Sequence, residues 1–220
     1  IGDSCQAVGA LGKPTRHISP FWGGKGGVIS AWSLNGGKQV PCGEGGAVVT
    51  NDESLARRAR LYLNHAENFG AKWVGINGRI NEPTALIAYH GLKDVLKRNA
   101  ERQQLARRLV ERLRNESRIR TLPDPDGHAL YVFPLVLQKG LDRAKFAQAL
   151  RARSVEVGEG YLTPPIYRYE AFKHCRRTPM PVVDELSERS LVILSQVRPP
   201  ATLGDMNYLA DAIRVALDAA

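Results

Sequence analysis

Apolar and polar positions alternate with two different periods along the 220-residue chain. Between residues 82 and about 114, leucine and valine recur every three or four positions, which predicts one long amphipathic helix. Gly91 is the weak point of that helix, because glycine lowers helix stability. Weak alternation with a period of two over residues 28–34, and the short β-branched run at residues 47–50, predict strands. The mixture indicates an α/β or α+β layer architecture.

The same pattern predicts the remaining elements. Asn51 or Asp52 is expected to cap a helix that reaches about residue 63, because either side chain can accept a hydrogen bond from a helix N-terminus. The Pro- and Asp-rich run at 123–127 breaks the chain. We therefore expect two domains, residues 1–114 and 115–220. Further strands are predicted at 28–34, 129–137, 155–157 and 191–194, and further helices at 142–151, 169–174, 183–189 and from Thr202 or Asp205 to 219.

Composition narrows the class of protein. The chain is 43% hydrophobic and 24% charged, which is typical of a globular domain. No apolar run approaches the roughly 20 residues that span a bilayer, and the chain does not open on a basic then apolar leader. The three cysteines are widely spaced and odd in number, and the histidines lack metal-ligand spacing. We expect a cytoplasmic protein with no membrane, disulfide or metal.

The formal net charge of +9 has two interpretations. Much of the excess lies in Arg57, Arg58, Arg60 and the run 97–114. A basic surface suits an anionic partner such as nucleic acid or a nucleotide-bearing substrate. Solvated helix faces are the favoured alternative, because acidic residues intervene and no aromatic residues interleave with the basic run. We therefore expect no nucleic-acid partner.

One lysine lies among hydroxyl, amide and glycine residues. From Ser33 to residue 50 the sequence reads Ser-Leu-Asn-Gly-Gly-Lys-Gln-Val-Pro-Cys-Gly-Glu-Gly-Gly-Ala-Val-Val-Thr. Glycines on both sides of Lys38 let the backbone approach a bulky ligand closely. A desolvated lysine there would be a nucleophile toward carbonyl compounds. An ordinary solvated loop lysine is the more common explanation of this pattern taken alone.

A second polar segment, Asp-Ser-Cys-Gln-Ala, occupies residues 3–7 after an apparent strand. A carboxylate at Asp3 could keep a pyridine nitrogen protonated, which the electron-sink chemistry of pyridoxal phosphate (PLP) needs. Gln6 could hydrogen-bond the phenolic oxygen of the same ring. The alternative is a turn aspartate that satisfies backbone amides.

In this order, the two segments resemble the DegT/DnrJ/EryC1/StrS aminotransferases, fold-type I PLP enzymes that act mostly on nucleotide-linked keto sugars. Downstream, residues 63–65, Leu-Asn-His, resemble that family's Arg-Asn-His-Gly. Residues 75–82 resemble its Gly-Tyr-Asn-Tyr-Arg-Met-x-Glu, and residues 164–167 a turn near the substrate. The resemblance implies an α/β fold, with the C-terminal part of the large PLP domain followed by a small α+β C-terminal domain.

The resemblance also implies residue roles. Lys38 corresponds to the lysine that forms the Schiff base with PLP and moves a proton between substrate and cofactor carbons. Asp3 corresponds to the partner of the pyridine nitrogen, Gln6 to a ring contact and Ser33 to a phosphate-binding hydroxyl. Asn77 corresponds to an amide that reaches the phosphate from a neighbouring subunit, which implies a homodimer with shared active sites. Residues that resemble substrate contacts are His65, Arg79, Tyr161 and Tyr167.

The chain departs from the family pattern without losing a catalytic group. Ala66 replaces the glycine after His65, and Gly78 replaces an aromatic residue. Family members carry a substantial N-terminal part before the Asp3 segment, with the phosphate-binding turn and an aromatic that stacks on the ring. We therefore expect the sequence to be a fragment or an incomplete gene product.

The implied reaction transfers an amino group from glutamate or glutamine to a nucleotide-linked keto sugar. Within the same family the alternatives are a cyclitol (inosose) aminotransferase and a dehydratase, although a dehydratase usually has histidine in place of Lys38. Outside enzymes, the alternatives are a truncated, non-catalytic assembly module and a nucleic-acid binder. The glycine-rich loop at 23–27 lacks the Gly-Lys-Ser/Thr of a P-loop.

Overall fold

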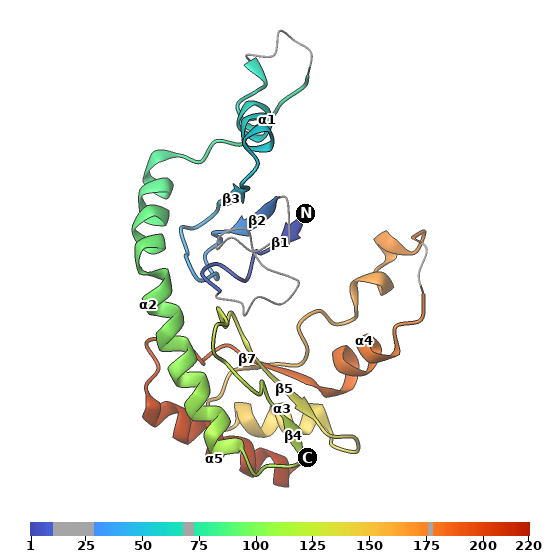
Figure 1. Cartoon of the computed structure of the whole chain (residues 1–220). Helices are drawn as coiled ribbons and strands as arrows, with labels where there is room; N and C mark the ends of the chain where they lie inside the picture. The colour runs from blue at the N-terminus through green and yellow to red at the C-terminus, as the bar shows by residue number, and fades with distance from the viewer. Residues whose placement is uncertain (11–28, 68–72, 176–177) are drawn as a thin grey trace. The chain divides into compact units, whose positions relative to one another are not determined.

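The computed structural model describes residues 1–10, 29–67, 73–175 and 178–220 (Figure 1). The glycine-rich loop at 23–27 lies outside these residues. The chain forms two compact units, residues 1–100 with 126–131 and residues 101–125 with 132–220. Helix α2, Glu82–Leu113, contributes to both units. The domain limits of 1–114 and 115–220 stay a prediction about how the protein is organised.

The first unit contains a three-stranded sheet in the order β1-β2-β3 (Figure 1). Its strands are β1, Gly2–Asp3, β2, Ser30–Ser33, and β3, Gly46–Val49. Strands β1 and β2 are parallel, with Asp3 opposite Ala31, and β3 runs antiparallel to β2. The carboxyl ends of β1 and β2 therefore lie at the same edge of the sheet.

Helix α1, Glu53–Leu63, follows β3 and confirms the predicted helix. The Asp52 side chain caps it by accepting a hydrogen bond from the Leu55 amide at 2.9 Å. The amide of Asn64 closes the other end on carbonyls of the last turn. Asn64 also forms an isolated antiparallel bridge with Asn77, so the chain doubles back after the helix.

The core of the first unit joins the sheet to the N-terminal half of α2. Close approach explains Gly91, because a Cβ there would lie 2.8 Å from Val40 Cγ1. The buried Asn99 side chain donates to the Val8 carbonyl at 3.0 Å, which ties the N-terminal segment to the same helix. The buried apolar cluster consists of Val8, Trp32, Leu34, Val40, Cys42, Ala88 and Val95.

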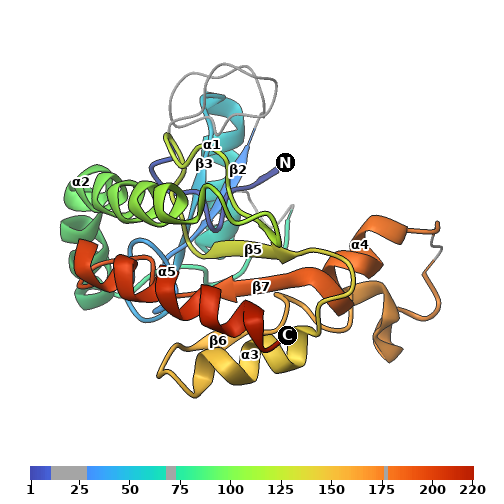
Figure 2. The same cartoon turned by 90° about the horizontal axis from the view of Figure 1, so that it is seen from below.

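The second unit is built on an antiparallel sheet in the order β4-β5-β7-β6, of which Figure 2 labels β5, β7 and β6. Its strands are β4, Ile119–Arg120, β5, Phe133–Leu137, β6, Val157–Gly158, and β7, Leu191–Leu194. Burial alternates along β5 and β7, as expected for strands with one face against a core. The predicted strand at 191–194 is confirmed.

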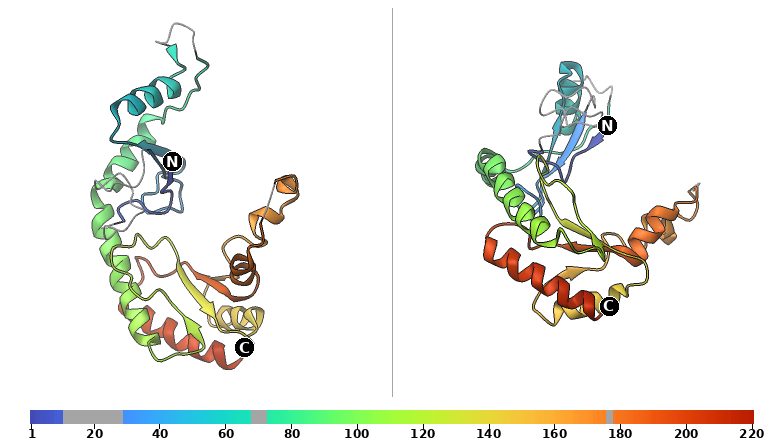
Figure 3. Two further views of the ribbon diagram at one scale, coloured as in Figure 1. Left: turned by 45° about the vertical axis from the view of Figure 1, so that its right-hand side comes forward. Right: turned by 60° about the horizontal axis from the view of Figure 1, so that its bottom comes forward.

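Two capped helices complete the core of this unit. Helix α3, Arg143–Arg151, begins at Asp142, whose side chain accepts from two helix amides. Helix α5, Leu203–Asp218, begins with a capping box between Thr202 and Asp205. Figure 3 shows α5 beside the C-terminal part of α2, where Arg112 pairs with Asp211 at 2.8 Å. The fully buried side chains of this unit include Phe133, Leu135, Phe146, Leu150, Val192, Leu194, Met206 and Ile213.

The clearest differences between prediction and structure concern four elements. The strand predicted at 155–157 is β6, which begins only at Val157. The strand predicted at 129–137 begins only at Phe133, because Leu130 adopts a φ of 46° that no strand accommodates. The helix predicted at 169–174 is wrong, since short 3₁₀ turns occupy 166–168 and 170–172. The helix predicted at 183–189 is α4, Pro181–Glu185, followed by a π-helical turn.

Candidate active site

Asp3 and Ser33 end two neighbouring parallel strands. Asp3 is the last residue of β1, and Ser33 is the last residue of β2. Lys38 follows in the loop after β2. Ligands of open α/β sheets bind outside the carboxyl ends of parallel strands. The topology therefore brings a carboxylate, a hydroxyl and an amine to one edge of the sheet.

The backbone of the Lys38 loop is fixed mainly by Asn35. Its carbonyl accepts from the Lys38 amide at 2.9 Å, and its side-chain oxygen accepts from the Gly37 amide at 3.1 Å. Its side-chain nitrogen donates to Glu44 at 2.7 Å, and its amide lies 3.4 Å from the Ser33 hydroxyl. The loop is thus closed on itself, and the partly buried Lys38 extends from it.

The Asp3 carboxylate is exposed and charged. The Cys5 amide donates to it at 3.1 Å. Hydrogen bonds from the Cys5 thiol and then from the Cys5 amide lower the pKa of Asp3 from its ordinary value, and the positive charge of Lys38 adds to that effect. The ammonium helps to keep the carboxylate ionised. An ionised carboxylate is the partner that would keep a pyridine nitrogen protonated.

A buried amide joins the two segments. The side chain of Gln39 is 1% exposed, and its nitrogen donates to the Gln6 carbonyl. The turn after Asp3 is therefore held by the residue that follows Lys38. The Gln6 side chain itself is exposed.

The structure adds one aromatic residue that sequence reasoning missed. The Lys38 ammonium lies 4.4 Å above the centre of the Tyr131 ring. Tyr131 lies within the strand predicted at 129–137. The structure shows that residues 126–131 pack with the first unit, and this packing brings Tyr131 to Lys38. No periodicity in the sequence could have indicated it.

Asn77, Arg79 and His65 form a separate exposed cluster in the first unit. The Arg79 guanidinium contacts the side-chain oxygens of Asn77 at 3.2 Å and Asn64 at 3.0 Å, and His65 Nε2 at 3.1 Å. His65 and Ala66 both have positive φ, 61° and 57°. Ala66 thus stands where the family pattern has glycine, and it adopts a positive φ that glycine adopts more readily than alanine.

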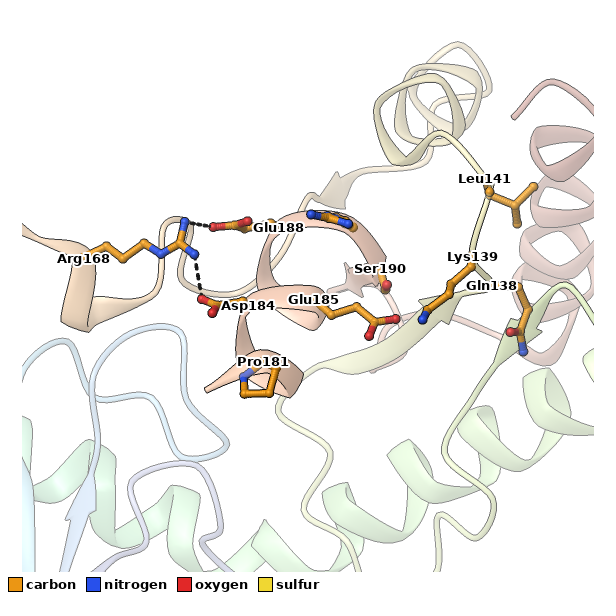
Figure 4. A pocket seen from close by; sticks show the side chains of 11 residues that line it. Gln138, Lys139, Leu141, Arg168, Pro181, Asp184, Glu185, Glu188 and Ser190 are labelled. Carbon is orange, nitrogen blue, oxygen red and sulfur yellow. Dashed lines mark hydrogen bonds and ion pairs between the residues drawn. The ribbon is translucent and has the colours of Figure 1, made fainter. Parts of the chain in front are cut away.

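Tyr161 and Tyr167 lie in the second unit. Tyr161 is exposed in the loop after β6. The Tyr167 hydroxyl donates to Asp184, and that hydrogen bond raises the pKa of Tyr167 above its ordinary value. Arg168 pairs with Asp184 at 2.8 Å and with Glu188 (Figure 4). Tyr167 is therefore engaged within its own unit.

The Arg168 ion pairs border a cavity of about 600 Å³ in the second unit (Figure 4). Its lining combines basic and acidic side chains, among them Lys139, Arg189 and Glu185. This mixture has no excess of one charge that would select an anion. The cavity contains none of the residues proposed from the sequence.

The donor set at the sheet edge fits pyridoxal phosphate. The group needs an amine for its aldehyde, an acid for its ring nitrogen and hydroxyl or amide donors for its phosphate. Asp3 and Ser33 supply two of these types from neighbouring parallel strand ends, and Lys38 supplies the amine from the loop after β2. Within the described residues, no set of three His, Cys, Asp or Glu side chains could hold a metal ion. Nor does any helix in that part of the chain have the length and apolarity to cross a membrane.

Comparison with known proteins confirms the fold. The crystal structure of a DegT DnrJ EryC1 StrS aminotransferase from Brucella abortus matches with a TM-score of 0.80 and 22% identity, over 98% of this chain and 56% of that one. An E. coli GDP-4-keto-6-deoxy-D-mannose-3-dehydratase with bound hydrated PLP matches with a TM-score of 0.78 and 14% identity, over 94% of this chain and 59% of that one. The expected PLP fold type I architecture is thus confirmed.

Sequence comparison identifies the family. A dTDP-3-amino-3,4,6-trideoxy-alpha-D-glucose transaminase of Streptomyces venezuelae is 30% identical over 181 residues, 78% of this chain and 45% of that protein. The chain thus spans about half the length of the curated relatives it matches. The family model described as "DegT/DnrJ/EryC1/StrS aminotransferase family" matches residues 1–214. The chain belongs to this family, whose cofactor is pyridoxal phosphate.

Proposed function

We propose that this chain carries the Schiff-base lysine of a PLP-dependent aminotransferase that moves an amino group from glutamate or glutamine to a nucleotide-linked keto sugar. The observation that supports this most is the arrangement at one sheet edge, where Asp3 ends β1, Ser33 ends the neighbouring parallel strand β2, and the loop with Lys38 follows β2 directly. An isolated surface lysine would have no carboxylate and hydroxyl placed in this way.

Each residue of the sheet edge has a distinct task in this proposal. When bound, the cofactor supplies an electron-withdrawing ring that stabilises negative charge on the substrate carbon. The Lys38 amine holds the cofactor aldehyde and later moves the proton at the substrate carbon. Asp3 keeps the ring nitrogen protonated, Ser33 donates to the phosphate, and Gln6 contacts the ring.

The substrate class rests on the relatives and on charge. Two curated relatives are named as transaminases of dTDP-linked amino sugars. This favours a nucleotide-linked sugar over a cyclitol. The formal net charge of +9 suits a substrate that carries a diphosphate, because long-range attraction raises the local concentration of anions. The amino donor is proposed from the family resemblance alone.

A second subunit belongs to the proposal. The exposed Arg79 cluster presents Asn77 and His65 at the surface of the first unit. Near it in sequence, helix α2 exposes Leu86 and Ile87 by more than half. Such adjacent apolar side chains would be covered if this part of the surface met a partner. We therefore propose a homodimer in which Asn77 reaches the cofactor phosphate of the partner, with Arg79 and His65 near the substrate.

The lysine assignment is tested by reductive trapping. The complete gene product, incubated with PLP, should gain visible absorbance. Borohydride should then fix the cofactor on the peptide that contains Lys38, as read by mass spectrometry. Lys93 is the internal reference, since it also lies over an aromatic ring but far along the chain in α2. Cofactor fixed on Lys93, or spread over many lysines, would refute the assignment.

The substrate class needs a separate test. Purified protein should aminate keto sugars linked to a nucleotide, and glutamate or glutamine should restore the aminated cofactor. Free keto sugars and inososes are the comparison substrates. A preference for an inosose would contradict the nucleotide-sugar proposal, while trapping without any turnover would favour a non-catalytic module.

A further inference from the structure

Tyr131 reaches the Lys38 loop from a distant part of the sequence. It lies in the segment 126–131, between β4 and β5, and that segment belongs to the first unit. Ala129 and Leu130 anchor the segment, since they are only 4% and 7% exposed. The position of Tyr131 is therefore determined by packing.

The backbone immediately before Tyr131 is strained. Leu130 has a φ of 46°, in the left-handed region that bulky residues rarely adopt. Such conformations persist only where the surrounding structure imposes them, and they concentrate at functional sites. Here the unusual conformation immediately precedes Tyr131, whose ring lies under Lys38.

The contact itself selects a charged amine. The Lys38 nitrogen lies 4.4 Å from the ring centre of Tyr131, within the range of a cation–π interaction. A Cβ added to Gly37 would lie 3.4 Å from the Tyr131 hydroxyl, so Tyr131 adjoins the residue before Lys38 as well. The ring quadrupole attracts an ammonium and has little attraction for a neutral amine.

We propose that Tyr131 is a positioning residue that holds the Lys38 ammonium in the cofactor-free protein, beside the place where that amine would take the cofactor aldehyde. This inference rests on the proposed function. Lys38 would leave the Tyr131 ring when its nitrogen gives up a proton, because only the neutral amine can bond the aldehyde carbon or accept the proton at the substrate carbon.

The first test uses the cofactor-free protein. Lys38 is acetylated at neutral pH with a limiting reagent, and the rate is read from its peptide by mass spectrometry. Because the reagent attacks the neutral amine, loss of the ring should speed labelling. Tyr131→Leu should raise the rate about two- to fivefold, the range that corresponds to partly exposed cation–π contacts. Tyr131→Phe keeps the ring and should retain the original rate.

A matched control lies in the same unit. Lys93 lies 4.2 Å from the ring centre of Tyr89 in α2. Tyr89→Leu should change the labelling of Lys93 and leave Lys38 unchanged, while Tyr131→Leu should do the reverse. Tyr131→Met repeats the measurement with a second non-aromatic side chain. A general loosening of the fold would accelerate both lysines together.

Two results would overturn the inference. One is a Lys38 labelling rate that is the same in Tyr131→Leu, Tyr131→Met and the unaltered protein. The other is a Phe variant that behaves like the Leu variant, because the ring would then not be the cause. Borohydride trapping on Lys38 in the unaltered protein is scored separately, so that failure of the proposed function is distinguished from failure of this inference.

Discussion

The Lys38 loop and the Arg79 cluster place polar groups in the same unit by different means. Asn35, Gln39 and backbone amides hold the Lys38 loop, and a buried apolar cluster lies beneath it. The Arg79 cluster depends on one exposed guanidinium that contacts Asn64, Asn77 and His65. Exposed side-chain contacts compete with water, so they stabilise less than buried ones.

The difference predicts that substitutions in the two regions have different effects, one on activity and the other on local stability. Replacing Lys38 should remove chemistry and leave its loop intact, because the loop's hydrogen bonds do not involve the lysine side chain. Replacing Arg79 should loosen the cluster itself, because the side chain is its centre. The following predictions test this contrast, from the largest expected effect to the smallest.

Lys38→Arg should abolish cofactor trapping and lower transaminase activity by about 10²- to 10⁴-fold, the contribution typical of a positioned acid/base group. The melting temperature should stay within experimental error. Activity is measured by amino-sugar formation and trapping by peptide mass. Lys93→Arg is the matched control and should change neither quantity. Retained activity in Lys38→Arg would end the proposed function.

Asp3→Asn should lower turnover about 10- to 100-fold, because a hydrogen bond to a charged group contributes about 1.5–3 kcal/mol. Trapping on Lys38 should persist. Because the pKa of Asp3 is lowered, its carboxylate is already negatively charged at the pH of the usual aspartate pKa. The negative charge is lost only when the pH falls through the lowered pKa. The pH–rate profile should therefore show no acid limb from Asp3 above pH ~4. Such a limb, absent in Asp3→Asn, would contradict this.

Gly91→Ala tests the packing beneath the Lys38 loop. The new Cβ would meet Val40 Cγ1 at 2.8 Å, so Val40 or α2 must shift. Overpacking typically costs about 1–3 kcal/mol, partly offset by the higher helix propensity of alanine. Urea unfolding of the protein measures the change. Lys97→Ala, on an exposed position of the same helix, should stay within about 0.5 kcal/mol.

Arg79→Lys keeps the charge and removes the planar donors that reach three partners. We expect a loss of about 1 kcal/mol, the net value of one or two exposed hydrogen bonds. Hydrogen exchange of the Ile76 and Gly78 amides, which bond to Tyr62 and Leu63, should accelerate. Arg57→Lys in α1 is the control. Unchanged exchange would show that the backbone bridge alone holds the cluster.

Ala66→Gly should give the smallest effect, a stabilisation of about 0.5 kcal/mol. Relief of the positive φ of 57° favours glycine, whereas loss of the buried methyl group opposes it. Ala56→Gly, inside helix α1, should instead destabilise by about 0.5–1 kcal/mol. Urea unfolding measures both variants. If both substitutions changed the free energy of unfolding in the same direction, the strain at Ala66 would be contradicted.

Local pattern predicted the regular elements well. The period of the apolar residues predicted the helix that is α2, and the pair Asn51 and Asp52 predicted the start of α1, where the structure selects Asp52 as the cap. The prediction was poorest where the chain is irregular, around Leu130 and over residues 166–172. No periodicity distinguishes a strained connection from the beginning of a strand.

The sequence by itself determined the family, the fold class and the segments that carry Lys38 and Asp3, because these depend on residue order and on local hydrophobic period. Tertiary structure decided which groups meet. Parallel pairing of β1 with β2 brings Asp3 and Ser33 to one edge, and the return of residues 126–131 puts Tyr131 under Lys38. The Lys38–Tyr131 contact joins positions about ninety residues apart, and only packing of the folded chain selects it.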